Sequence, residues 1–62
     1  MITEYKKTLR KLKISHQNVA DYTGHARETI TNWLNGVATP PKIKEEHIEQ
    51  EIKEMIELKK EE

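Results

Sequence analysis

The sequence predicts an all-α protein, a compact bundle of four to five helices in a single domain over residues 1–62. Apolar residues recur at intervals of three and four, which is the spacing of one face of a helix. Each of the two glycines, Gly24 and Gly36, follows such a segment, at a place where glycine commonly ends a helix. No segment alternates apolar and polar residues as a half-buried strand would.

The first helix is expected over about residues 2–12, where Tyr5, Leu9 and Leu12 fall at i, i+4 and i+7. Its other faces are basic. Residues 1–36 hold six basic and three acidic side chains, whereas residues 37–62 hold five basic and eight acidic ones. The net charge of zero therefore divides into +3 and −3. A surface for a polyanion such as nucleic acid is expected in the first half, although such charge runs can also serve only to solvate helices.

The second and third helices are expected over about residues 16–22 and 27–34. Ser15 is a natural N-cap for the second helix, because its hydroxyl can accept a hydrogen bond from an otherwise unpaired amide. Ala26 precedes the third helix and has no side chain that can cap, so we expect that start to be weakly capped.

One or two helices are expected within residues 42–60. Thr39 is the expected cap, with Pro40 and Pro41 in the first turn, where proline loses no needed hydrogen bond. Ile43 lies off the apolar stripe that follows, so the alternatives are a short helix leading into a longer one, or a bend between residues 43 and 48. The stripe consists of Ile48, Ile52, Met55 and Ile56, with Leu58 at its margin.

Several classes of protein are excluded or disfavoured by composition. The chain has no cysteine, and His16, His25 and His47 fit no common zinc spacing, so no metal is expected. We find no nucleophile–base pair and no phosphate-cradling glycine loop, and therefore expect no enzyme activity, no cofactor and no small-molecule ligand. No apolar run approaches the roughly 18 residues of a membrane span, so no membrane association is expected.

Five residues have the spacing of two short helices that cross at a steep angle. Ala20 is small enough for the two backbones to approach, and Gly24 can adopt the positive φ of a tight turn. Ile30 and Trp33 lie one turn apart on the second of these helices and can pack on Val19. The opposite face of that helix then stays free, which is the layout of a helix-turn-helix.

The segment from about Tyr5 to Gly36 resembles the Cro/C1-type (XRE, lambda-repressor-like) helix-turn-helix family. The matching positions are Ile14-Ser15, Val19-Ala20, Thr23-Gly24, Arg27, Thr29-Ile30, Trp33 and Asn35-Gly36. The resemblance implies a sequence-specific regulator of transcription, most simply a small phage or mobile-element repressor. It also implies that residues 27–34 enter the major groove of double-stranded DNA, and it favours the cytoplasm of a bacterial or phage-infected cell.

The resemblance assigns base contacts to Arg27, Glu28 and Asn32, with Ala26 and Thr31 nearby. The chemistry is suitable, because arginine can donate two hydrogen bonds to guanine, glutamate can accept one from cytosine, and asparagine can pair with adenine. Each such contact is worth about 1–3 kcal/mol of discrimination. In the alternative interpretation these side chains are only the solvated face of a helix, with Glu28 favoured there by the helix dipole.

The resemblance assigns phosphate contacts to His16 and Gln17 at the start of the second helix, where amides and the dipole attract anions. Asn35, Thr29 and Lys13 are further candidates by position.

Three features depart from the family pattern: one pair of residues, one histidine and one loop. Leu9 and Leu34 replace an arginine–glutamate pair that is frequent in the family, and we expect them to form an apolar contact instead. His25 replaces an apolar residue, and is expected either to be partly buried and hydrogen-bonded or to point toward DNA. The loop after Gly36 has no basic residue, so the affinity of one copy for the DNA backbone should be modest.

The distal part of the acidic last helix, with Met55, Ile56 and Leu58, is the expected contact between two copies of the chain. A homodimer would place two recognition helices about 34 Å apart, which matches a palindromic operator. Two other functions stay open. The fold could instead serve as a protein-interaction module, such as an antirepressor or adaptor, or as an antitoxin-type regulator that needs a partner toxin.

Overall fold

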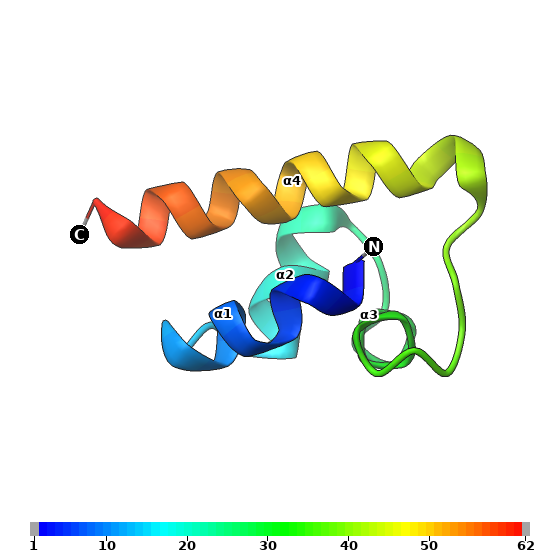
Figure 1. Ribbon diagram of the computed structural model, residues 1–62, viewed down its shortest axis with the longest axis horizontal. Coiled ribbons are helices and arrows are strands. Elements are labelled where there is room, and N and C mark those ends of the chain that lie inside the picture. Colours follow the sequence, from blue (N-terminus) through cyan, green and yellow to red (C-terminus); the bar gives the residue numbers. More distant parts are fainter. Residues whose placement is uncertain (1, 62) are drawn as a thin grey trace.

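The computed structural model describes residues 2–61, which are helical for most of their length and contain no strand. The elements are η1 (Ile2–Tyr5, a 3-10 helix), α1 (Lys6–Lys11), α2 (His16–Thr23), α3 (Arg27–Leu34) and α4 (Lys42–Lys60). In Figure 1 the long helix α4 runs along one side of the molecule, with α1 and α2 beneath it and α3 seen end-on. The C-terminal end of α4 lies at the opposite end of the molecule from α3. The prediction of an all-α helix-turn-helix bundle is confirmed.

One apolar core holds the helices together. Val19 and Ala20 of α2 are buried against the same core as Ile30 and Trp33 of α3, as the spacing predicts. The rest of the core comes from the end of α3, from η1, α1 and α4, and from the turn after α1: Ile2, Leu9, Ile14, Leu34, Ile48, Ile52 and Ile56. Leu9 and Leu34, which replace the arginine–glutamate pair of the Cro/C1 pattern, are each 1% exposed and lie in the core.

The capping and turn residues predicted for α2 and α3 are confirmed. The Asn18 amide donates a hydrogen bond to the Ser15 hydroxyl at 3.1 Å, so Ser15 caps α2. Gly24 ends that helix with φ +76°, and its amide donates to the Ala20 carbonyl at 2.9 Å. Ala26 makes no side-chain capping bond to α3. Asn35 is the C-cap of α3, and Gly36 follows it with φ +76°.

The first helix differs from the prediction of one helix over residues 2–12. Residues 2–5 form the 3-10 helix η1, and the α-helix begins only at Lys6. Isoleucine and threonine at positions 2 and 3 are β-branched and disfavour the start of an α-helix, and short 3-10 turns are common at helix ends. Ile2 is nevertheless 3% exposed, so this short turn anchors the start of the chain in the core.

The last helix is a single α-helix, and the alternative of two helices or a bend is wrong. Ile43 is 94% exposed, so no core contact pulls that turn out of line. The predicted Thr39 cap is also wrong. Pro40 precedes a proline and therefore avoids the helical conformation, so the helix cannot begin directly after Thr39. The N-cap is Pro41, whose carbonyl accepts hydrogen bonds from the amides of Lys44 and Glu45, each at 2.9 Å.

A side-chain hydrogen bond ties α2 to α4. The Tyr22 hydroxyl donates to the Glu54 carboxylate at 3.0 Å. This bond is the main cause of a raised pKa of Tyr22; burial and the negative charges of Glu54 and Glu51 raise the pKa further. The protonated phenol is therefore favoured in the folded state.

A mutation at Gly24 tests whether the turn needs a positive φ. A Cβ at Gly24 meets no atom within 4 Å, so any cost of Gly24→Ala comes from the backbone conformation and not from crowding. We expect Gly24→Ala to lower the free energy of unfolding by about 1–2 kcal/mol, and Gly24→Asn to lower it less, because asparagine tolerates this conformation. Chemical denaturation followed by circular dichroism measures both. Equal stability of the glycine and alanine proteins would contradict the assigned turn.

The Tyr22–Glu54 bond predicts a dependence of stability on pH. Because the pKa of Tyr22 is raised above 10.0 in the folded state, the bond contributes its full stability below pH 10 and loses it as the pH rises through the raised pKa. Tyr5→Phe leaves Tyr22 as the only tyrosine, so the absorbance of tyrosinate reports it alone. Adding Glu54→Gln should lower the pKa of Tyr22 toward 10.0. An unchanged titration would show that Glu54 does not hold the phenol.

Candidate nucleic-acid interface

Helix α3 has one buried and one exposed face. Its buried residues are Ile30, Trp33 and Leu34. At 100° per residue, Glu28 and Asn32 lie opposite this buried side, with Asn35 beyond the end of the helix. Glu28 and Asn35 are exposed and Asn32 is half-buried. Of the five predicted base-contacting residues, Glu28 and Asn32 therefore lie on the side of α3 that faces away from the core.

A hydrogen bond joins the start of α2 to the middle of α3. His16 Nδ1 and Thr31 Oγ1 are 2.8 Å apart, and both side chains are partly buried. A predicted phosphate-contacting residue and a predicted base-contacting residue are thereby held side by side. Arg27 lies one turn before Thr31 on the same flank of α3 and is exposed. A threonine hydroxyl has one donor and two acceptor positions, so Thr31 keeps capacity for another partner.

The basic face of α1 reaches the same place. Lys6, Arg10 and His16 line one surface hollow of about 320 Å³, together with Leu9 and Ile14. Sequence analysis missed Lys6 and Arg10 as candidate site residues. Their i, i+4 spacing on a basic helix was the available signal, but only the folded chain shows that this face lies beside the start of α2.

Gln17 is a weaker candidate than His16. Its side-chain amide donates a hydrogen bond to the Asp21 carboxylate of the same helix at 2.8 Å. A phosphate group at Gln17 would have to displace this bond and would lie near a negative charge. The ring nitrogen Nδ1 of His16 is instead hydrogen-bonded to the neutral hydroxyl of Thr31.

The three remaining phosphate candidates are scattered. Lys13, exposed and with φ +61°, lines a different hollow with Tyr22 and Leu58, so the structure does not bring it to His16. Thr29 is half-buried on the flank of α3 away from Thr31. Asn35 is exposed at the end of α3. Of these three, only Asn35 extends the exposed face of α3.

The loop after α3 is fixed by its backbone. The amides of Val37 and Ala38 both donate hydrogen bonds to the Asn32 carbonyl, at 2.9 and 3.2 Å. Residues 35–41 carry no charged side chain, and Val37 is 75% exposed. The loop therefore adds backbone and apolar surface beside the exposed face of α3, but no charge.

His25 packs on the core tryptophan. Its ring lies edge-on to that of Trp33, with centroids 5.1 Å apart and an interplanar angle of 71°. His25 is half-buried and Trp33 is 8% exposed. The tryptophan is thus a core residue, and the histidine shields its edge at the turn.

The three predicted dimer contacts fall into different environments. Ile56 is 6% exposed and belongs to the core of a single chain, so it offers little surface to a second copy. Met55 is partly buried against that core. Leu58 is 56% exposed.

Within residues 2–61, no helix is both long and apolar enough to cross a membrane. The same residues hold no group of three or more histidine, cysteine or acidic side chains that could bind a metal ion.

Comparison with known proteins identifies the family. The family model of the ParB HTH domain matches residues 3–59, which include nearly all of the helical structure described above. No curated protein and no solved structure gives a significant match. The match supports a DNA-binding helix-turn-helix, but it does not support the Cro/C1 type specifically. The chain belongs to the ParB HTH domain family, a helix-turn-helix family.

Proposed function

We propose that the chain is a sequence-specific regulator that binds double-stranded DNA with α3 in the major groove. The observation that supports this most is the His16–Thr31 hydrogen bond. It joins the flank of α3 that carries Arg27 to the start of α2, beside which Lys6 and Arg10 lie. Side chains suited to bases and side chains suited to phosphates thus share one continuous surface.

The exposed face of α3 supplies base recognition in this proposal. The Arg27 guanidinium donates two hydrogen bonds to the O6 and N7 atoms of a guanine, and the Asn32 amide pairs with an adenine. Glu28 accepts a hydrogen bond from the amino group of a cytosine and repels phosphates, which favours its place over bases. The methyl groups of Ala26 and Thr31 suit contact with a thymine methyl group.

In this proposal the cluster of Lys6, Arg10 and His16 contacts the phosphates of the DNA backbone. Each cation that neutralises a phosphate releases condensed counterions, so the affinity falls as salt rises. Lys6 and Arg10 are the only lysine or arginine side chains that line this hollow, so the affinity of a single copy for the DNA backbone is modest. The proposal therefore includes two copies of the chain on a palindromic operator, with recognition helices about 34 Å apart.

The experiment is a selection from random duplexes, followed by salt titration on the enriched sequence. We expect an enriched motif and an affinity that falls as salt rises. Arg27→Ala should relax the preference at one base pair, at a cost of about 1–3 kcal/mol. Arg10→Ala should weaken all sequences alike and should reduce the slope of log K against log salt by about 1.

Lys60→Ala is the matched control. Lys60 is an exposed lysine at the end of α4 that does not line the hollow of the cluster, so its loss should change neither the motif nor the salt slope. Absence of any enriched motif, together with no loss of affinity at higher salt, would overturn DNA binding and leave an antirepressor, adaptor or antitoxin-type function. Uniform weakening by Arg27→Ala would instead overturn the assignment of base recognition to α3.

A further inference from the structure

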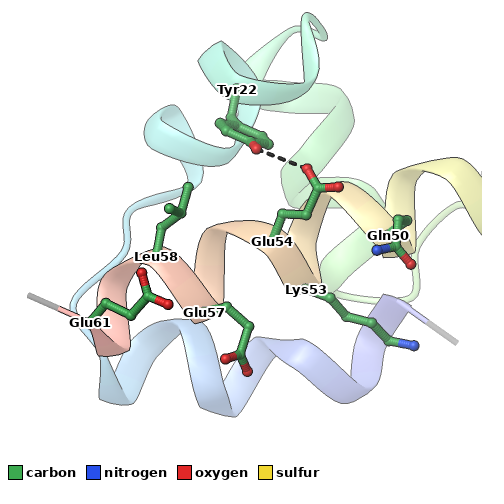
Figure 2. Close-up of a pocket in the computed structure, with 7 residues that line it drawn as sticks. All are labelled: Tyr22, Gln50, Lys53, Glu54, Glu57, Leu58 and Glu61. Atoms are coloured by element: carbon green, nitrogen blue, oxygen red, sulfur yellow. Dashed lines mark hydrogen bonds between the residues drawn. The ribbon is translucent and has the colours of Figure 1, made fainter.

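Two surface hollows meet between α2 and α4, and they share Tyr22 and Leu58. The first hollow, of about 370 Å³, is shown in Figure 2 and is also lined by Gln50, Lys53, Glu54, Glu57 and Glu61. The second hollow, of about 230 Å³, is also lined by Lys13, Ile14, Asn18, Met55 and Lys59. Together they form one surface, which we call the α2–α4 groove.

The middle of the α2–α4 groove is apolar and exposed. Tyr22 and Leu58 are 42% and 56% exposed, and both are large side chains. Met55 extends this apolar strip and packs partly on the core. The Tyr22 hydroxyl is bonded to Glu54, which holds the phenol in place (Figure 2). An exposed apolar strip with polar margins is typical of an interaction site.

The two sides of the α2–α4 groove carry opposite charge. The first hollow has three glutamates, Glu54, Glu57 and Glu61, against the single Lys53. The second hollow has lysines, Lys13 among them, and no acidic residue. The acidic and the basic side therefore flank the apolar strip.

We propose that the α2–α4 groove binds a second copy of this chain about a twofold axis. In such a pair each surface meets itself after a half turn. With the axis along the strip of Tyr22 and Leu58, the acidic side of one copy faces the basic side of the other, and the reverse contact forms symmetrically. The two apolar strips meet in the middle and lose contact with water.

Charge decides between this occupant and others. A basic peptide would be attracted to the glutamates of the first hollow but repelled by the lysines of the second. An acidic peptide would be attracted to the lysines but repelled by the glutamates. A partner that has one basic and one acidic side can place each of them against the opposite charge of the groove. A second copy of this chain has these two sides.

The position of the groove is compatible with DNA binding. It is formed at the C-terminal part of α4, which lies far from α3 in Figure 1. On α2 it uses Asn18 and Tyr22, not His16. Pairing therefore leaves the exposed face of α3 open, and this inference deepens the proposed function by supplying the surface for the second copy.

Sedimentation equilibrium of the 62-residue chain without DNA tests the pairing. We expect a monomer–dimer equilibrium over a concentration range that reaches about 1 mM. Leu58→Asp should raise the dissociation constant at least about tenfold, because it places a charge at the centre of the contact. Ile43→Asp is the matched control, since Ile43 is 94% exposed on the same helix but lies outside the groove, and it should change nothing. Circular dichroism confirms that each variant is folded.

A mixing experiment tests the twofold arrangement of charges. Lys13→Glu and the double variant Glu57→Lys/Glu61→Lys should each pair more weakly than the original chain, because like charges then face each other. Mixed in equal amounts they should associate more tightly than either alone, since each exchanged charge in the mixed pair faces exchanged or original charges of the opposite sign. Lys13 has φ +61°, and lysine and glutamate both carry an unbranched Cβ there, so Lys13→Glu adds no backbone strain.

Three results would overturn the proposal: a monomer at every concentration, a Leu58→Asp variant that pairs as well as the original, or no gain on mixing. None of these measurements involves DNA. Their failure would therefore leave the proposed DNA binding intact, and failure of the duplex selection would leave the pairing intact.

Discussion

The crossing of α2 over α3 is the constraint on which the rest of the structure depends. Val19 and Ala20 are at most 1% exposed where the two helices share one core with Ile30 and Trp33. Gly24 allows the tight turn through its positive φ, and the His16–Thr31 bond holds the far end of the crossing. Three core residues lie on one side of α3, so Glu28 and Asn32 face away from the core. A partner of this helix can therefore contact it only on that side and its flanks.

Most of the fold could be predicted because its signals are local in sequence. The Ser15 cap, the two positive-φ glycines and the apolar spacing each depend on neighbours within a few residues. The placement of side chains depends on tertiary packing and could not be predicted in the same way. The sequence did not indicate that Lys6 and Arg10 lie beside His16 or that Lys13 lines a different hollow, and Ile56, a predicted dimer contact, lies in the core. The motif residues also could not separate the ParB type from the Cro/C1 type, because any steep crossing of two short helices needs small and apolar residues at these places.

The separation of basic and acidic side chains on the surface matters more for binding than the net charge of zero. The basic face of α1 lies beside the candidate DNA surface, whereas Glu54, Glu57 and Glu61 line a groove on another part of the molecule. A polyanion would therefore be steered to one side of the protein. The same segregation gives the α2–α4 groove its two signs, so one pattern of charge serves both proposals.

The central claim is that the exposed face of α3 contacts base pairs in the major groove. Nuclear Overhauser effects between isotope-labelled protein and its selected duplex test this directly. The claim predicts contacts from the methyl groups of Ala26 and Thr31 to major-groove protons such as thymine methyl or cytosine H5. Contacts to DNA that arise from α4, with none from α3, would contradict it.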